Sequence, residues 1–447
     1  MATRRWLGHA LDVYQRDTIT IADTWAAADT VTLTIDNIDF VITIGSLVTT
    51  TQVATTIKEA CNGSPSTLTD TTASYTNSAN PNQSGGATAI PQFSDLEASS
   101  SGAVVSIHAK TAGRPFTLSV TENTAGTGTA TEATATAATG AANFANQDNW
   151  SANTVPVDAD TVSLDSGDAD LLYSISQAAV SPAAINVTMG YSGKIGLPET
   201  NKQNAAFPYR EYLEDYLTMG AVADAQTNTI TIGDGEGQGS QRIKIDTVDA
   251  QTILNVLNSG QRIETGVPAV LWKGTHASNV ANISKGDVGI AALVGETATV
   301  ATLTVAYRNN KQGDAKVYCG TGVTLTTINQ SGGELRTASN VVTVNHFDGF
   351  HKIDAGTVTT LNIDGGTVEY NGTGTCTNLK IGSNGTLDLS KGTGAVTFTN
   401  TEFYEGFTFI DPAARATFTN GIDFMRCTPA DGKFVVVPHR TWTPTAI

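Results

Sequence analysis

A repeat in the C-terminal third of the chain constrains the fold most strongly. The segments TLTTINQSGGELR, VTVNHFDGFHKI, TTLNIDGGTVEY and TNLKIGSNGTLDL each contain a short apolar strand, a corner of Asn, Asp or Gly, and a second short strand. Ile328, Val344, Leu361 and Leu379 are equivalent in them, at intervals of 16, 17 and 18 residues. One such unit cannot bury its apolar side chains alone, but stacked units can. The repeat predicts a β-solenoid with a C-terminal cap over residues 300–447, in which these four side chains form one inward-facing row.

The preceding residues, 143–299, contain short β-type segments separated by Gly-rich turns, among them TVSL, AINV and NTITI. We expect a β-rich region that leads into the solenoid. A helix is indicated only in the short run FPYREYLEDYL, residues 207–217.

The N-terminal residues, 1–123, have a different pattern. Apolar and polar residues alternate over 30–35 and 40–44, with Asp and Asn between the two segments, which predicts a β-hairpin. The next segment changes period, because Val53, Ile57 and Cys61 are four residues apart and Asn-Gly follows. We therefore expect a short helix against the sheet and a small α+β domain.

The rest of this domain is less regular. Residues 63–100 are rich in Ser, Thr, Gly and Pro and predict a long loop, whereas 103–110 and 115–122 predict a second hairpin. Residues 124–142 contain few large apolar side chains, which predicts a Thr/Ala/Gly-rich linker. A Thr-rich strand at a sheet edge is the alternative for that segment. The chain is thus expected to be mainly β, with a small α+β domain before a β-solenoid body.

Charge and hydropathy exclude several classes of partner. The chain of 447 residues has 25 Lys and Arg against 42 Asp and Glu, a net charge of −17, so nucleic acid is not an expected ligand. No apolar run approaches the ~20 residues that cross a bilayer, and the N-terminus does not resemble a signal peptide. We expect a protein made in the cytoplasm without membrane contact. Cys61, Cys319, Cys376 and Cys427 are far apart without metal-ligand spacing, which favours structural thiols.

The sequence Gly233-Asp234-Gly235-Glu236-Gly237-Gln238-Gly239 is the strongest local motif for a metal. Asp234 and Glu236 are candidate ligands because Ca²⁺ accepts flexible oxygen coordination. The motif lacks the spacing of an EF-hand and the Lys of a phosphate loop. A solvated glycine-rich corner is the alternative, and no cofactor is expected.

Four acidic residues, Asp354, Asp364, Glu369 and Asp388, fall in successive repeats and could align on one face of the solenoid. Paired carboxylates are the groups with which glycosidases cleave polysaccharide. Nothing in the sequence distinguishes these four from ordinary surface acids, so we expect no catalytic residues and no enzyme activity.

One aromatic patch occurs in the repeat region, at His346, Phe347, Phe350 and His351. Exposed aromatic side chains often anchor interfaces, so these four residues are candidates for a contact with a receptor or subunit. Packing at an edge of the solenoid is the alternative.

Two stretches resemble hypothetical proteins encoded in phage and planctomycete-like prophage genomes. One is TWAAADTVTLTIDNIDFVITIGSLVTTTQVATTIKEA, and the other is NWSANTVPVDADTVSL with its continuation through GKIGLPE, GEGQGSQRIKID and GVTLTTINQSGG. The resemblance covers most of the chain and implies a structural protein of a tailed-phage virion, without naming a catalytic residue. The second stretch is also similar to the opening coil of secreted β-solenoid proteins, which bears on fold more than on function.

The function implied is that of a capsid decoration or head-fibre protein, assembled in the host cytoplasm and located on the virion. Its expected partners are other virion proteins of capsid or tail and further copies of itself, as a homotrimer. The alternative is a tail fibre or tailspike adhesin that binds host surface glycan, with polysaccharide depolymerase activity as a further variant.

Overall fold

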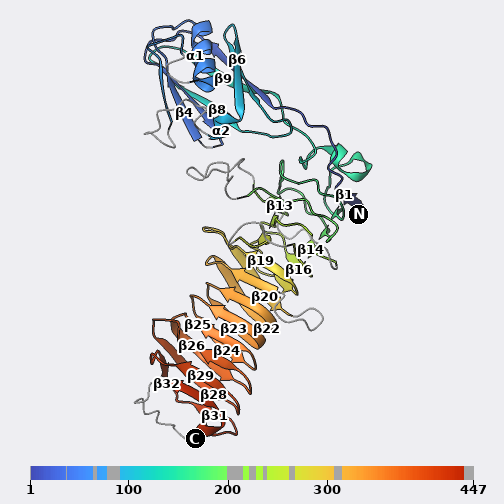
Figure 1. The fold of residues 1–447 in the computed structure, drawn as a ribbon, viewed down its shortest axis with the longest axis vertical. Coiled ribbons are helices and arrows are strands. Elements are labelled where there is room, and N and C mark those ends of the chain that lie inside the picture. The colour runs from blue at the N-terminus through green and yellow to red at the C-terminus, as the bar shows by residue number, and fades with distance from the viewer. Residues whose placement is uncertain are drawn as a thin grey trace.

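The protein forms a long β-solenoid with a small α+β domain at its N-terminal end (Figure 1). The structure is a computed structural model and describes residues 2–36, 38–63, 68–77, 91–198, 215–220, 228–234, 239–260, 267–306 and 315–436. The predicted mainly β fold, with a solenoid body, is confirmed.

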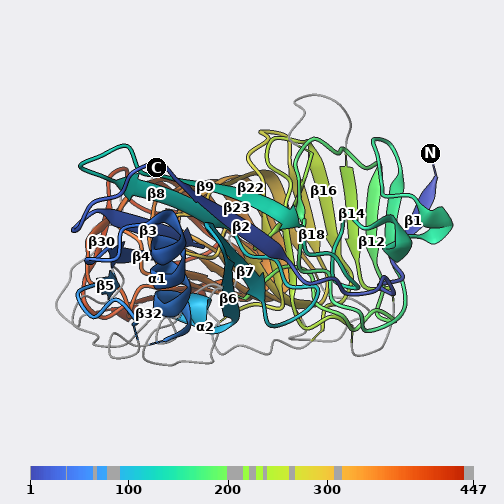
Figure 2. The same ribbon diagram turned by 90° about the horizontal axis from the view of Figure 1, so that it is seen from above.

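The described solenoid strands belong to one 24-stranded sheet in which neighbouring coils pair in parallel. They form two stacks along the body, and the long strands β22 and β23 contribute to both. Stack I consists of β1 (Thr3–Arg5), β10 (Thr161–Leu164), β12 (Ala184–Val187), β14 (Asn228–Ile232), β16 (Thr252–Val256), β18 (Val280–Ile283), β20 (Ala298–Val305), β22 (Val323–Thr337), β23 (Val341–Ile353), β24 (Val358–Ile363), β26 (Gly374–Ile381), β28 (Val396–Phe403), β30 (Ala416–Phe418) and β31 (Asp423–Phe424). Stack II consists of β11 (Ser176–Gln177), β13 (Leu217–Met219), β15 (Ile243–Asp246), β17 (Val270–Lys273), β19 (Gly286–Ile290), β21 (Ala315–Cys319), the second halves of β22 and β23, β25 (Thr367–Tyr370), β27 (Thr386–Asp388), β29 (Thr408–Asp411) and β32 (Lys433–Val436). Figure 2 shows β12, β14, β16 and β18 side by side along stack I.

The predicted inward-facing row is present. Ile328 is the register partner of Val344, Val344 of Leu361, and Leu361 of Leu379. All four side chains are buried in one core that runs from Trp6 to the last coils. Each coil of 16 to 18 residues forms one level of the solenoid and therefore adds one apolar side chain to a continuous buried column.

Asparagine side chains stabilise the outer surface of stack I. The amide nitrogen of Asn345 donates to Asn329 at 2.9 Å, and that of Asn362 donates to Asn345 at 2.9 Å. A second ladder runs from Asn378 through Asn400 to Asn420. Parallel in-register strands place identical amides one above the other, so the amide of each coil forms a hydrogen bond with the amide of the next coil.

An arginine ties the C-terminal coils together. The buried guanidinium of Arg415 donates to the carbonyl oxygens of Tyr370, Gly372, Leu389 and Gly394 at 2.7 to 2.9 Å. A buried guanidinium is tolerated where nearly all its N–H groups have acceptors. Arg415 thus joins several coils from inside.

The first coil is closed by aromatic side chains. Strand β1 pairs with β10, and the backbone N–H of Ala2 and the Arg4 side chain both donate to Asp160. Trp6 and Trp150 are buried with ring centroids 5.0 Å apart in an edge arrangement. The indole of Trp150 donates to the Phe144 carbonyl at 2.7 Å. Strand β1 therefore lies at the edge of the described sheet and forms part of the cap of this coil.

The α+β domain is an insertion between β1 and β10. It has two antiparallel four-stranded sheets, β6-β7-β2-β9 and β5-β4-β3-β8, and a hydrophobic core of its own. The connecting segments run antiparallel, and the Val13 N–H donates to the Thr139 carbonyl at 2.7 Å. The elements are β2 (Arg16–Ala22), β3 (Thr30–Ile35), β4 (Ile38–Thr43), α1 (Thr50–Asn62), β5 (Ser74–Asn77), α2 (Pro91–Ser94), β6 (Leu96–Ser101), β7 (Val104–Ala109), β8 (Leu118–Asn123) and β9 (Thr129–Thr136).

The predicted first hairpin and helix are present. Strands β3 and β4 pair antiparallel, and α1 buries Val53, Ile57 and Cys61. Thr49 caps the helix with Gln52, because each side chain bonds to the backbone N–H of the other residue. The helix packs against β2, β6 and β7.

The second hairpin was predicted wrongly. Residues 104–109 form β7, which pairs with β2 and β6, whereas residues 118–123 form β8, which pairs with β3 in the other sheet. The segment between them crosses from one sheet to the other. The expected loop over 63–100 also contains β5, α2 and β6; its residues 64–67 and 78–90 lie outside the described part.

The expected linker, 124–142, is also corrected. Residues 129–136 form the edge strand β9, which pairs with β2, so the Thr-rich strand alternative holds. The expected boundaries of the α+β domain, 1–123, change at both ends because β1 belongs to the solenoid and β9 to the α+β domain.

The expected division at residue 300 does not mark a change of fold. Stack I passes from β18 to β20 and β22 by the same parallel pairing. Of the predicted helix at 207–217, residues 207–214 lie outside the described part, and Leu217 begins strand β13. No described helix is long and apolar enough to span a membrane.

Candidate functional site

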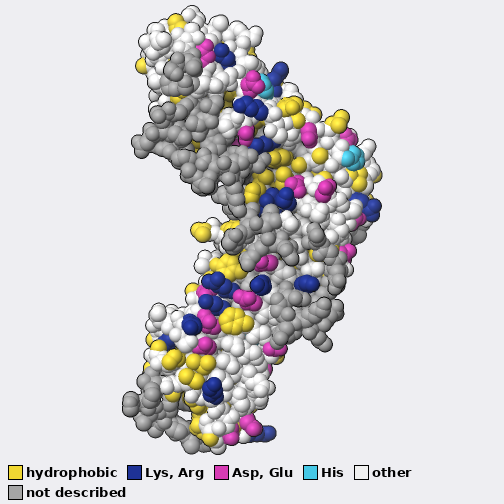
Figure 3. All heavy atoms as spheres, viewed as in Figure 1, with side chains coloured by type: hydrophobic (Ala, Val, Ile, Leu, Met, Phe, Trp, Pro, Cys, Tyr) yellow, Lys and Arg dark blue, Asp and Glu magenta, His cyan; other side chains and the backbone are white. Residues whose placement is uncertain are grey.

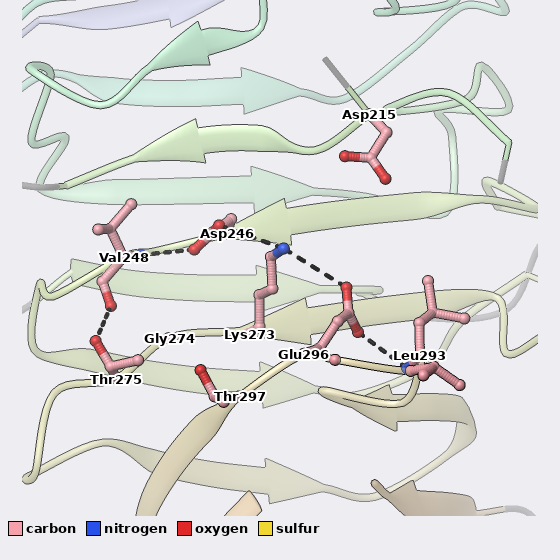
Figure 4. Close-up of a pocket in the computed structure, with 11 residues that line it drawn as sticks. Asp215, Asp246, Val248, Lys273, Gly274, Thr275, Leu293, Glu296 and Thr297 are labelled. Atoms are coloured by element: carbon pink, nitrogen blue, oxygen red, sulfur yellow. Dashed lines mark hydrogen bonds and ion pairs between the residues drawn. The ribbon is translucent and has the colours of Figure 1, made fainter. Parts of the chain in front are cut away.

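A pocket of about 410 Å³ opens on the outer side of stack II (Figure 4). Its walls come from the segment before β13, from the ends of β15 and β17, and from the loop between β19 and β20. The lining residues are Asp215, Asp246, Val248, Lys273, Gly274, Thr275, Leu293, Val294, Gly295, Glu296 and Thr297.

Lys273 is the central charge of the pocket. Its Nζ lies 3.6 Å from Oδ2 of Asp246 and 3.5 Å from Oε1 of Glu296. The same ammonium lies 4.2 Å from the ring centroid of Tyr216, close enough for a cation–π contact. Two carboxylates and one aromatic ring therefore hold the ammonium in place.

A second lysine lies beneath the pocket. Lys244 is buried, and its Nζ is 2.9 Å from Oδ2 of Asp215 and donates to the Leu197 carbonyl at 3.1 Å. It also lies 4.5 Å from the ring centroid of Tyr216. A buried ammonium needs a paired charge, and Asp215 supplies it.

Asp246 is an acid of the pocket whose pKa is shifted. Burial raises the pKa of Asp246, while the Val248 N–H, which donates to its Oδ1 at 2.8 Å, and Lys273 act in the opposite direction. Carboxyl groups with shifted pKa values in a pocket are typical of functional sites.

The loop after β19 forms a fixed wall. Glu296 Oε2 accepts the Leu293 N–H at 3.0 Å, and the Glu296 N–H donates to the Leu293 carbonyl at 3.2 Å. Ala291 and Gly295 have φ values of 39° and 84°, which turn the chain back toward β17. On the opposite side, the Thr275 hydroxyl donates to the Val248 carbonyl at 2.8 Å.

This arrangement favours binding over hydrolysis. Because both carboxylates contact the same Nζ, their contacting oxygens are at most about 7 Å apart, a spacing that glycosidases also use. In a glycosidase, however, the scissile bond lies between the two carboxyl groups. Here the Lys273 ammonium occupies that space (Figure 4).

The predicted calcium ligands do not form a described site. Asp234 is exposed and its Oδ1 accepts the Met189 N–H at 2.9 Å, whereas Glu236 lies outside the described residues. Among the described residues, no group of three or more His, Cys, Asp or Glu side chains is placed to hold a metal ion.

The predicted aromatic contact patch is divided between the inside and the outside of the solenoid. His346 and His351 are buried in the core, so the contact role is wrong for these two residues and the packing alternative holds. Phe347 is 51% exposed and Phe350 is partly exposed. Strand alternation places His346 and Phe347 on opposite faces.

The buried histidines form a polar cluster. His346 Nδ1 bonds to Gln330 Oε1 at 3.2 Å, and His351 Nε2 bonds to the Thr337 hydroxyl at 3.1 Å. Their rings are 6.3 Å apart. Burial lowers the pKa of His346 to about 4 and that of His351 to about 3, so both rings are neutral at pH 7.

The four acids considered for depolymerase activity all have partners. Asp354 pairs with Arg336 and Lys352, and Glu369 pairs with Lys352 at 3.2 Å. Asp364 pairs with Lys380, and Asp388 accepts the Ser390 N–H. Glu369 and Asp388 are register neighbours, but the four do not line the pocket. Figure 3 shows basic and acidic side chains interspersed on the visible face of the solenoid.

The cysteines are unpaired, and three of them are buried: Cys61, Cys319 and Cys376. Burial raises the pKa of each of these thiols to about 12, which keeps them protonated and unreactive. Cys427 is partly exposed.

Sequence reasoning missed the pocket because its charged residues come from four separate segments. Asp246, Lys273 and Glu296 are neighbours only after the coils have stacked. No local motif marks them, and only a register of the coils would have indicated their proximity.

Comparisons with protein-family models, with curated proteins and with solved structures found no match to this chain.

Proposed function

We propose that this protein is a non-enzymatic structural component on the exterior of a tailed-phage particle, as a capsid decoration or head-fibre protein. The observation that carries the proposal is the insertion of a separate α+β domain into the first coil of a long solenoid. One end of the molecule thus has a compact domain suited to attachment, and the rest forms a projecting body. The resemblance to phage and prophage proteins supports the same role.

The body has the properties of a stiff spacer. Stack I contains thirteen described levels from β1 to the level shared by β30 and β31, and parallel strands are roughly 4.8 Å apart, which gives a length of about 60 Å. Its core is continuous from Trp6 to Ala416. Because each described coil packs on its neighbours, we expect the body to resist bending.

The alternative role is a tail fibre or tailspike adhesin. The same architecture would serve it, with the solenoid directed at the host surface. Copy number per particle separates the two roles, because decoration proteins reach hundreds of copies and tail fibres only a handful. Quantitative mass spectrometry of purified particles measures this number directly.

Attachment is tested by removing the α+β domain from the full chain. Val13 and Thr139 are paired antiparallel, so an Asn-Gly turn can join them and replace residues 14–138. We expect this variant to retain the solenoid, measured by circular dichroism, and to lose co-sedimentation with particles that lack the protein. If the folded variant sediments with particles as well as the full chain does, the solenoid is the anchor.

We also propose that the protein is a homotrimer, since fibre proteins of phage commonly assemble with threefold symmetry. Analytical ultracentrifugation of the full chain tests this. A species with three times the mass of one chain is expected, and a monomer at micromolar concentration would contradict the assignment.

A further inference from the structure

We infer that the pocket around Lys273 binds a neutral sugar unit of a polysaccharide, without cleaving it. Such a binding site goes beyond the proposed structural role. Its assignment rests on the geometry of the pocket, and it holds whether the protein lies on the head or on the tail.

The polar groups of the pocket complement hydroxyl groups. Asp246 and Glu296 are acceptors that a sugar hydroxyl can donate to, and the Lys273 ammonium is a donor to a hydroxyl oxygen. Thr297 adds an exposed hydroxyl at the rim. Hydroxyl groups both donate and accept, so they match a site in which carboxylates and an ammonium alternate.

The net charge of the pocket selects against acidic sugars. Three carboxylates and one ammonium line it, and the second ammonium, on Lys244, is buried behind Asp215. A uronate or sialate would place another carboxylate beside Asp246 and Glu296, and like charges at this distance repel. A neutral sugar avoids that cost.

The rim supplies the apolar contact that a sugar ring requires. Val294 is fully exposed although it is aliphatic, and it lies beside Leu293 in the loop that forms one wall. The C–H groups of a pyranose can cover Val294 while its hydroxyls reach the charged residues. A volume of about 410 Å³ is at the small end of ligand pockets, which suits a short segment of a longer chain.

The site is organised before a ligand arrives. Lys273 is held by two carboxylates and the Tyr216 ring, and Glu296 is held by the Leu293 N–H. Few side chains must be ordered on binding, so little conformational entropy opposes it. The Lys273 ammonium between the carboxylates also leaves no room for a scissile bond, which is why we assign binding without hydrolysis.

The test uses the full-length protein and defined oligosaccharides. Isothermal titration calorimetry is run with isomaltohexaose, cellohexaose and hexa-N-acetylchitohexaose as neutral probes and with hexagalacturonate as the acidic probe. We expect at least one neutral probe to bind and hexagalacturonate to bind at least about tenfold more weakly. Failure of all three neutral probes at millimolar concentration, or equal binding of hexagalacturonate, would overturn the assignment.

Variants locate the binding in the pocket. Glu296→Gln keeps an oxygen for the Leu293 N–H but removes a charged acceptor, so the dissociation constant should rise about tenfold or more. Val294→Glu changes a fully exposed side chain and should also weaken binding. Asp388→Asn, on the outer side of stack II but outside the pocket, is the matched control and should bind as the wild type does.

Wild-type affinity in both Glu296→Gln and Val294→Glu would place the sugar elsewhere and refute the site. Release of shorter oligosaccharides by the wild type, lost in Glu296→Gln, would refute binding without hydrolysis. Neither result bears on particle attachment, which the deletion of the α+β domain tests separately.

Discussion

Acid should destabilise the solenoid through its two buried histidines. Both rings lie in the core, where burial lowers the pKa of His346 to about 4 and that of His351 to about 3, from an ordinary value of 6.5. A hydrogen bond to the Gly349 backbone and the charge of Asp348 both act to raise the pKa of His346, but burial outweighs them. A histidine whose folded pKa is lowered contributes stability that is complete above 6.5 and is lost as the pH falls toward the folded value.

The magnitude follows from these shifts. Between pH 6.5 and pH 4.5 the unfolded chain binds protons at both positions and the folded chain binds almost none, so each histidine costs about 2 to 3 kcal/mol. Together they remove roughly 5 kcal/mol, a large part of the total stability of a typical domain. His351 Nδ1 is buried without a hydrogen-bond partner, so a proton on this nitrogen would have no acceptor.

The assay is guanidinium unfolding at a series of pH values from 7.5 to 4.5, with hydrogen exchange to locate the affected coils. Wild-type protein should lose stability steeply below pH 6, with amides of β22 and β23 exchanging first. His351→Phe should have a shallower acid slope, by about 1.4 kcal/mol per pH unit. His9→Gln, at an exposed histidine, is the control and should retain the wild-type slope. Equal slopes for wild type and His351→Phe would refute the reasoning.

Three further predictions follow from the fold. Ile328→Asp should lower the free energy of unfolding by several kcal/mol and abolish soluble protein because it buries an unpaired charge. Val342→Asp, at a half-exposed position of the next coil, is the control and should fold. A melting temperature of Ile328→Asp equal to that of the wild type would rule out the inward-facing row. Arg415→Met should lower stability by about 3 kcal/mol or more because it leaves buried carbonyls without donors, and a melting temperature within a degree of wild type would contradict this. The protein should release no reducing ends from capsule or lipopolysaccharide; release that is lost in Asp364→Asn or Glu369→Gln would reverse that expectation.

The sequence predicts those parts of the fold in which apolar residues recur at a regular short interval. Alternation over residues 30–44 gives the hairpin of β3 and β4, and four-residue spacing gives α1. The 16-to-18-residue interval gives the register from Ile328 to Leu379, because each coil repeats the same inward position. In each case the signal lies within one element or between consecutive units.

The parts that were missed depend on partners far apart in the chain. Strand β1 pairs with β10, 158 residues later by the register of Thr3 with Thr161, and no local pattern encodes that contact. The two strands expected as a second hairpin were separated into two sheets by the same kind of distant pairing. The sequence left open whether His346 and His351 are exposed or packed, because their hydrogen-bond partners Gln330 and Thr337 lie in the preceding coil.

The Thr/Ala-rich segment before the solenoid shows how one composition can suit two structures. Residues 124–142 have too few large side chains to form a hydrophobic core. A flexible linker has the same kind of composition. Strand β9 within it lies at the edge of its sheet and is exposed along most of its length, so it needs β-branched residues for extension but few apolar ones for burial. Only Ala130 is buried in it, against β2 and the core of the α+β domain. The two segments that connect the domain to the solenoid pair with each other, because the Val13 N–H donates to the Thr139 carbonyl. The α+β domain therefore enters and leaves the solenoid at one place, next to the coil that Trp6 and Trp150 close.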